Sequence, residues 1–358
     1  MSLAADLSRF GGAVLADLPR LFHRHAAQVD DGPCFVDQPG RPRRVRPNCD
    51  AVEIAAMFDQ LPPGRSRAGW VELLGSCQDS ASGLVGEHLA CDRRLDPPPR
   101  PDGPDRYTTM AVNYALECLG AHLPTPVHDV AAIDADRLVH LLEAQAWDDD
   151  PWEAGHWVDC HASCMDANVR HFSLAGPVEV LFDWLDAHCD KASGLWGTPG
   201  ENGWLLPVNG FYRLTRGTYA QFGRPLPHPA AARATVWAHC GDQTVFGQGR
   251  GTACQVLDVV HPLWLCQSQG LDRLGPIEDW TAARLRLALS RWSPGQGFAF
   301  DPADGEPGLQ GTEMWLSIVY LMAQTLGLAD QLGYRPRGVH RLEPPTTGDD
   351  AGATAMTS

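Results

Sequence analysis

Lysine is almost missing from this sequence, because Lys191 stands alone beside 27 arginines. Schiff-base catalysis and phosphate binding by a P-loop both need a placed lysine, so the sequence nearly excludes them. Positive charge as a whole is scarce: 28 basic residues oppose 44 acidic ones, and the formal net charge is −16. Proteins that bind nucleic acids usually carry a basic excess, so we expect no nucleic-acid partner.

Long apolar runs are missing too. No stretch of 18 apolar residues exists, which predicts no membrane span. The first 30 residues lack the basic and then apolar order of a secretory signal. The 11 cysteines are an odd number and scattered, which favours a reduced, cytoplasmic protein over a disulfide framework.

An internal repeat indicates how the chain is organised. Residues 79–86 (DSASGLVG) and 190–197 (DKASGLWG) are identical at six of eight positions. We expect both segments to form the same turn, with Gly83 and Gly194 at positive φ. Lys191 is then a surface residue of a structural element.

Three glycines that follow helical patterns form a second set of repeated positions. Gly120, Gly223 and Gly327 each follow a helical pattern and lie 103 and 104 residues apart. Glycine at these places is typical of a left-handed residue that ends a helix. One unit of the chain therefore repeats every two helical hairpins.

Apolar residues at i, i+3 and i+4 predict paired helices, and no segment shows a convincing alternating strand pattern. The first helices of the pairs are expected at 70–79, 138–147, 180–190 and 281–292, and the second helices at 108–120, 156–172, 208–223, 251–267 and 309–327. Residues 8–27 and 50–60 are expected to add a sixth helix or pair.

The second helices are apolar all along, which suits a buried inner ring. We therefore predict an all-α fold: a single α/α toroid of five to six hairpins over residues 1–342, with inner and outer helix rings. The inner helices should begin near residues 107, 156, 208, 252 and 310, run parallel and surround one cavity. Residues 343–358 are polar and are expected to form a disordered tail.

The hairpin turns SCQDSASGL, HCDKASGLWG and RWSPGQGFAF resemble those of the α/α-toroid superfamily. That group includes the terpene cyclases and the β subunits of protein prenyltransferases. The resemblance covers roughly residues 66–330 and implies two helix rings around a central cavity, without naming a substrate. The chain departs from class II cyclases, because it has only Asp148-Asp149-Asp150 in place of their Asp-x-Asp-Asp motif and is long enough for only one toroid.

Asp258 and His261 are the first candidates for catalysis. They lie three residues apart in an otherwise apolar helix, and a carboxylate beside an imidazole suits acid–base chemistry. The other interpretation is a core histidine at a kink, because Pro262 follows directly. We expect His261 and Asp258 to face the cavity near Asp159 and Tyr212, either of which would be the complementary acid.

Arg213 and Arg216, in a helix rich in aromatic residues, suggest a bound anion or else an internal ion pair. Trp152, Asn209 and Glu313 lie near the starts of inner helices and complete the predicted substrate-binding set.

We expect no cofactor and no metal, although Asp159, Cys160 and His161 supply donor types that zinc accepts. The run Asp148-Asp149-Asp150 is either a proton donor or a solvated turn that caps the next helix.

The first functional hypothesis is a cytoplasmic enzyme that cyclises or isomerises an isoprenoid-type anion in an aromatic-lined cavity. An alternative is a lyase, hydrolase or epimerase acting on an acidic sugar, and another is a toroid that binds a ligand without catalysis. An apolar cavity favours the first, a cavity dense in carboxylates and hydroxyls the second, and a blocked cavity the third. The expected partner is a small molecule, and the oligomeric state stays open.

Overall fold

Helices dominate the structure. This computed structural model describes the whole chain except residues 1, 30–31, 90–98, 101–103, 304 and 346–358. The described residues hold fourteen α-helices and one two-stranded sheet, which confirms the predicted all-α class. No helix in this part of the chain is both long and apolar enough to cross a membrane.

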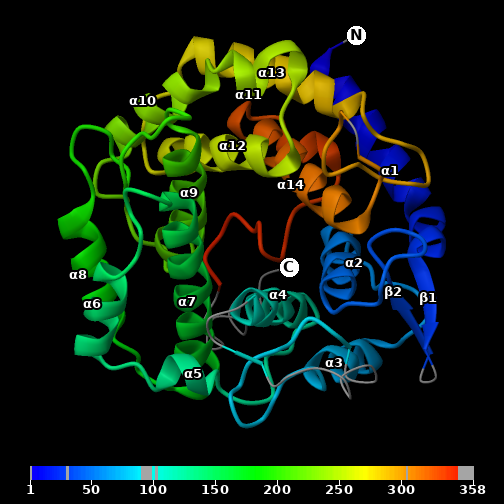
Figure 1. Cartoon of the computed structure of the whole chain (residues 1–358). Helices are drawn as coiled ribbons and strands as arrows, with labels where there is room; N and C mark the ends of the chain where they lie inside the picture. The colour runs from blue at the N-terminus through cyan, green and yellow to red at the C-terminus, as the bar shows by residue number, and fades with distance from the viewer. Residues whose placement is uncertain (1, 30–31, 90–98, 101–103, 304, 346–358) are drawn as a thin grey trace, which may run out of the picture.

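Six helices buried on nearly all sides form an inner ring (Figure 1). They are α2 (Arg46–Met57), α4 (Asp105–Cys118), α7 (Pro151–Phe172), α9 (Leu205–Thr215), α12 (Ala253–Ser268) and α14 (Leu309–Thr325). Each contacts the next in that order, and α14 contacts α2, so the ring closes. Burial in α12 is unbroken from Val256 to Cys266, because neighbours cover it on both sides and from outside.

Six amphipathic helices cover this ring from outside. They are α1 (Leu3–His25), α3 (Arg67–Gly75), α6 (Ala135–Glu143), α8 (Val178–His188), α10 (Pro229–Cys240) and α13 (Gly275–Leu289). Each precedes an inner helix along the chain, and the short helices α5 (His128–Ala131) and α11 (Gln243–Phe246) lie in connections. In α6 only Leu138 and Leu142 are buried, as expected of a helix with one covered face.

The inner helices begin close to the predicted residues. Their starts at Asp105, Leu205, Ala253 and Leu309 lie within three residues of the expected 107, 208, 252 and 310. Helix α7 begins five residues before the expected 156. There the Asp150 carboxylate accepts a hydrogen bond from the Glu153 amide, and Pro151 occupies the first turn.

The structure contains a short β-hairpin that the sequence pattern did not predict. Strands β1 (Ala26–Val29) and β2 (Gly32–Phe35) pair antiparallel, with Ala26 opposite Phe35. The expectation of no strand was wrong here, because four residues are too few to show alternation reliably.

The repeated turns have the predicted shared conformation. Gly83 and Gly194 have φ of 76° and 74°. Their amides donate to the carbonyl oxygens of Asp79 and Asp190, at 2.7 Å in both turns. Lys191 is exposed, as expected.

The three glycines spaced 103 and 104 residues apart also behave as predicted. Gly120, Gly223 and Gly327 have φ of 71°, 66° and 70° just after an inner helix or its continuation. They leave the helix in left-handed conformation, which an L-residue adopts only with strain.

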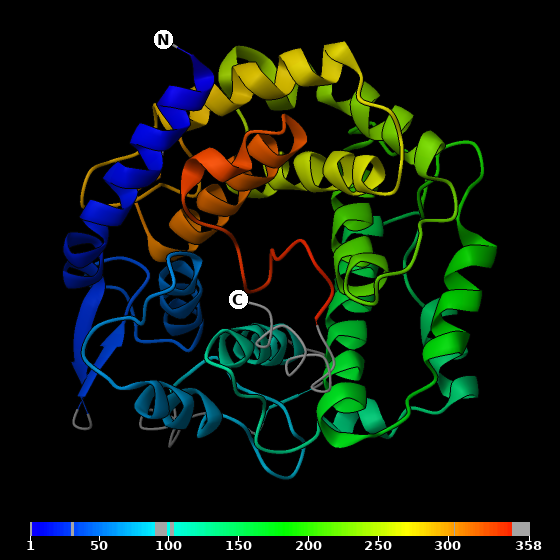
Figure 2. The same cartoon turned by 180° about the vertical axis from the view of Figure 1, so that it is seen from behind.

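Residues 333–345 cross the centre of the ring, which the sequence did not predict (Figure 2). Val339 and His340 are buried there. The predicted disordered tail began at Glu343; residues 343–345 are described, and 346–358 lie outside the described residues.

Candidate functional site

The closed ring brings ionisable side chains from five inner helices and the central segment together. The buried members are Asp50, Glu53, Asp159, Asp258, His261, Glu313 and His340, with Arg216 among them. An unpaired polar group in such a place costs about 1–3 kcal/mol, so the partners of each group decide what the site can do.

Asp159 on α7 holds two arginines of α9 and its continuation. Arg216 forms an ion pair with Asp159, and the Arg216 Nε–H donates to Oδ1 at 3.2 Å. Arg213 Nη1 lies 3.8 Å from Asp159 Oδ2. The π-helical turn η2 (Arg216–Ala220) continues α9, and Gly217 lies so close to Asp159 that a Cβ would strike it. Two guanidiniums thus share one carboxylate.

Within the described part of the chain, Asp258 forms no ion pair with Arg213 or Arg216. Burial raises the pKa of Asp258 well above its usual range, although Arg213 and Arg216 oppose that rise. Asp258 Oδ2 accepts from the Asn209 amide at 3.2 Å, and Oδ1 has no partner. Among the described residues, Asp159 at 3.8 Å is thus the ion-pair partner of Arg213.

His261 lies deeper in the ring. Its imidazole centroid is 5.2 Å from the Tyr212 ring and 5.3 Å from the Trp264 ring. Burial, with help from His340 and Arg216, lowers the pKa of His261 to about 3. Neither His261 Nδ1 nor Asp258 Oδ1 has a hydrogen-bond partner among the described residues, so these two atoms do not pair with each other.

His340 is a central residue that sequence reasoning missed. Its Nδ1 lies 2.9 Å from Glu313 Oε1, and its Nε2 lies 3.0 Å from the Tyr212 hydroxyl. With Nδ1–H donating to Glu313, Nε2 accepts the proton of Tyr212. Burial alone would raise the pKa of Glu313, but His340 brings that pKa below its usual value. No repeat or periodicity marks His340 in the sequence.

The rest of the central segment is fixed in a similar way. The Val339 amide donates to Glu53 Oε2 at 2.8 Å. Arg341 forms an ion pair with Glu117 and donates to Gln221 Oε1 at 2.9 Å. Helices α2 and α4 are thus tied to the segment through the carboxylates of Glu53 and Glu117.

A cavity of about 240 Å³ opens where α2, α4 and α14 begin. We call it the mouth pocket; it is lined by Asp37, Arg44, Arg46, Pro47, Asp50, Glu87, Pro104, Tyr107, Thr108 and Gln310. All of these except the two prolines have polar side chains. Such a pocket suits a ligand with hydroxyl and charged groups.

Tyr107 connects the mouth pocket to Arg213. The Arg46 guanidinium donates to the Tyr107 hydroxyl, and the guanidinium carbons of Arg46 and Arg213 lie 5.1 and 5.5 Å from the Tyr107 ring centre. The His156 ring lies 5.5 Å from that of Tyr107, and Trp152 stacks on His156 at 5.7 Å. One phenol is thus surrounded by two cations and an imidazole.

Two groups at this cluster have strongly shifted pKa values. Burial raises the pKa of Asp50 to about 7, against the effect of Arg46, whose Nε–H donates to Asp50 Oδ1 at 2.7 Å. Burial lowers the pKa of His156 to about 3, and Arg213 adds to this effect. At neutral pH His156 is therefore a neutral imidazole with one unprotonated ring nitrogen.

Metal-donor atoms gather near the same place in a different set from the predicted one. Those of His156, Asp159 and Cys160 all lie within 4.8 Å of one another. The His161 ring instead stacks on Trp157 at 4.9 Å, and neither of its nitrogens has a partner. Because Arg216 pairs with Asp159, this donor set is poorly suited to a cation.

The aspartate run before α7 has a structural role at its last position, because Asp150 caps the helix. This agrees with the capping interpretation of the run. Asp148 accepts a hydrogen bond from the Thr198 hydroxyl at 3.1 Å and, like Asp149, is exposed.

No protein-family model and no curated protein matches this chain. Membership of the α/α-toroid superfamily therefore stays a prediction, and the closed helix ring is the structural feature that supports it.

Proposed function

We propose that the protein is an enzyme that uses acid–base catalysis on a carboxylate-bearing, hydroxyl-rich small molecule, such as an acidic sugar, at the mouth pocket. The observation that carries the proposal is the cluster at Tyr107. Two guanidiniums and a neutral imidazole surround one phenol beside a pocket lined by polar side chains. Catalytic sites are typically places where such shifted groups converge on a cavity.

The isoprenoid hypothesis has less support. An isoprenoid chain needs an apolar cavity, whereas the mouth pocket is polar and residues 333–345 cross the centre of the ring. The occupied centre is also what a non-catalytic toroid would show, and the experiment below includes that outcome.

In the proposed reaction Arg213 binds the substrate carboxylate, because its positive charge is only partly balanced by Asp159. His156 accepts the proton from the carbon next to that carboxylate. The C–O bond on the following carbon breaks, a C=C bond forms, and the departing oxygen takes the proton of Tyr107. Water then carries the proton from His156 back to Tyr107, which completes a β-elimination.

His261 and Asp258 lie deeper than this cluster and have no part in the proposed step. The prediction that His261 is the base stays a prediction, so the two histidines need separate variants. A cytoplasmic location is part of the proposal, and it is supported by the odd number and the scatter of the 11 cysteines in the sequence.

The test incubates the purified chain with a panel of uronic acid oligosaccharides. It follows the ultraviolet absorbance of an unsaturated product and, by mass spectrometry in D2O, exchange at the carbon next to the carboxylate. We expect His156→Gln and Tyr107→Phe to lower the rate by about 10²-fold or more with normal folding. His140→Gln, an exposed histidine on α6, is the matched control and should keep full activity.

Three results would decide against the proposal. A His156→Gln variant with the wild-type rate would remove the assigned base. Loss of activity in His261→Gln alone would move the base to the deeper site. A chain that binds uronates without elimination or exchange would favour the ligand-binding toroid.

A further inference from the structure

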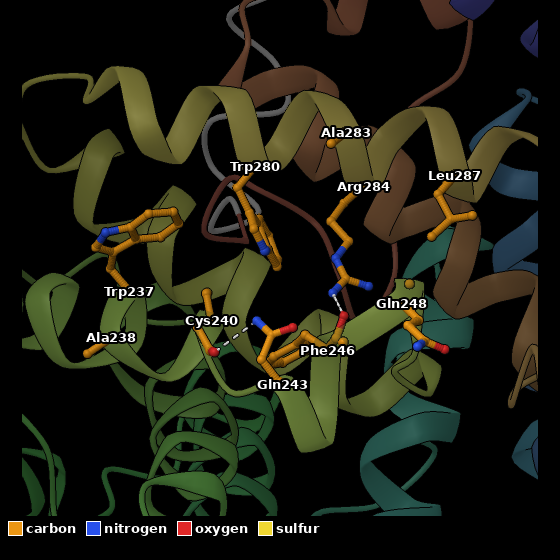
Figure 3. Close-up of a pocket in the computed structure, with 13 residues that line it drawn as sticks. Trp237, Ala238, Cys240, Gln243, Phe246, Gln248, Trp280, Ala283, Arg284 and Leu287 are labelled. Carbon is orange, nitrogen blue, oxygen red and sulfur yellow. Dashed lines mark hydrogen bonds between the residues drawn. The ribbon is translucent and has the colours of Figure 1, made fainter.

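A cavity of about 630 Å³ lies between the outer helices α10 and α13, beside α11 and the short turn η3 (Gly247–Gly249) (Figure 3). Thirteen described residues line it, among them Trp237, Phe246, Gln248 and Trp280. Arg284 is the one charged residue of this described lining. A purely cationic cavity is unexpected on a chain with a net charge of −16.

Arg284 has uncharged partners. Figure 3 shows its side chain extending from α13 toward Phe246. The guanidinium carbon lies 5.3 Å from the ring centres of both Phe246 and Trp280. Its Nη1–H donates to the Arg250 carbonyl at 2.7 Å, and Nη2–H donates to the Phe246 carbonyl. Within the described part of the chain, no carboxylate forms an ion pair with Arg284.

This arrangement leaves a half-buried cation without a counter-ion. Burial lowers the pKa of Arg284, and the nearby Arg291 adds to this effect. A guanidinium in partly desolvated surroundings gains most from an anion that it can contact by charge-assisted hydrogen bonds. The cavity therefore favours a negatively charged occupant.

The aromatic residues that line the cavity indicate the shape and polarity of the rest of the ligand. Trp237 and Trp280 stand edge to face, with centroids 6.5 Å apart, and Phe246 adds a third ring. Gln248 adopts the left-handed conformation, with φ of 52° and ψ of 30°. Such strained residues occur often at ligand sites, because the surrounding structure must hold them in place. Flat aromatic walls suit a planar, apolar ligand body.

We propose that this cavity binds a small anion with a planar aromatic body, its oxyanion toward Arg284 and its ring against Trp237 and Trp280. The site does not depend on the proposed function. It is separate from the mouth pocket, since it is formed by outer helices and shares no lining residue with it.

The test measures binding of 2-naphthoate and of the neutral 2-naphthamide by calorimetry and by quenching of tryptophan fluorescence. We expect the carboxylate to bind at least about ten-fold more tightly than the amide, because only the carboxylate pairs with the guanidinium. Arg284→Gln should abolish this preference, and Arg284→Lys should keep part of it. Arg286→Gln, which removes an exposed arginine of the same helix, should bind like the wild type.

A parallel measurement with 2-naphthyl phosphate tells whether the oxyanion is a carboxylate or a phosphate. Equal affinities of the wild-type protein for naphthoate and naphthamide would overturn the proposal, as would an unchanged preference in Arg284→Gln. If Arg284→Gln fails to fold, Trp237→Ala replaces it, because Trp237 makes none of the described contacts of Arg284. Naphthoate binding unchanged by Trp237→Ala would place the ligand elsewhere.

Discussion

At the scale of single residues, Asp159 is the most constrained group of the buried site. It is fully buried between Arg216 and Arg213, and no other described carboxylate forms an ion pair with either arginine. Removing one member of a buried ion pair leaves a buried charge without a counter-charge. This destabilises the fold more than replacing both members by apolar residues of similar volume.

Asp159→Ala should therefore lower the free energy of unfolding by about 3–5 kcal/mol, measured by urea denaturation. Glu179→Ala is the matched control, because it breaks the exposed ion pair with Arg224 and should change little. Equal stability of the two variants would mean that Arg216 finds another anion.

Asp50 should make anion binding at the mouth pocket depend on pH. Its pKa is raised to about 7, so Asp50 becomes neutral as the pH falls through that value. Arg46 then loses its counter-charge, although Glu53 and Glu313 also act on it. Affinity for glucuronate should rise on the order of ten-fold from about pH 8 to pH 6, measured by calorimetry.

Asp50→Asn is the variant that tests this explanation. It fixes a neutral group beside Arg46 at every pH, so the affinity for glucuronate should stay high and lose most of its pH dependence. A variant that keeps the full pH dependence would assign the effect to another group.

At the scale of elements, the repeated turn follows the outer helix of a hairpin and leads toward its inner helix. A Cβ at Gly83 would strike the Pro126 carbonyl, and one at Gly194 would strike the backbone of Ala232. Glycine is therefore needed at both positions for two reasons: φ is positive, and the backbone of a following segment lies too close to leave room for a Cβ.

Gly83→Ala and Gly194→Ala should each destabilise the fold by more than Gly203→Ala. Gly203 has φ of 60° with open space around it, so its replacement should cost only the left-handed strain, roughly 1–2 kcal/mol. In Gly83→Ala and Gly194→Ala the new Cβ also overlaps with backbone atoms, which should lower the stability by about 1–3 kcal/mol more. Thermal unfolding of the three variants checks this order, and equal losses would show that the neighbouring segments can shift.

At the scale of the whole molecule, the central segment bonds to side chains of several inner helices at once. Its contacts with Glu53, Glu313 and Glu117 satisfy carboxylates on α2, α14 and α4. A chain that ends at Gly333 would lose all of these contacts, whereas one that ends at Pro345 would keep them.

The chain ending at Gly333 should unfold at a lower temperature, because Glu53 loses the Val339 amide and a buried group without a partner costs about 1–3 kcal/mol. Glu313 and Glu117 would keep Ser317 and Arg170 as partners. The chain ending at Pro345 should unfold like the full-length protein. Adding a peptide of residues 334–345 should restore part of the lost stability, measured by calorimetry. Identical unfolding of the two truncated chains would show that the segment contributes little.

The sequence by itself determined the features that depend on neighbouring residues. Helix periodicity, the cap at Asp150 and the left-handed glycines at 83, 194, 120, 223 and 327 are set within a few residues by backbone sterics and hydrogen bonding. This is why the hairpins and most inner-helix starts could be predicted.

The tertiary structure decided the composition of the site. His340 meets Tyr212 across 128 positions of the chain, and Arg46 meets Tyr107 across 61. Neither pairing leaves a periodic or repeated trace in the sequence, because both depend on where closure of the ring places non-repeating segments. Burial then shifted the pKa values of Asp50, His156 and Asp258, since desolvation acts only after the surrounding helices have excluded water.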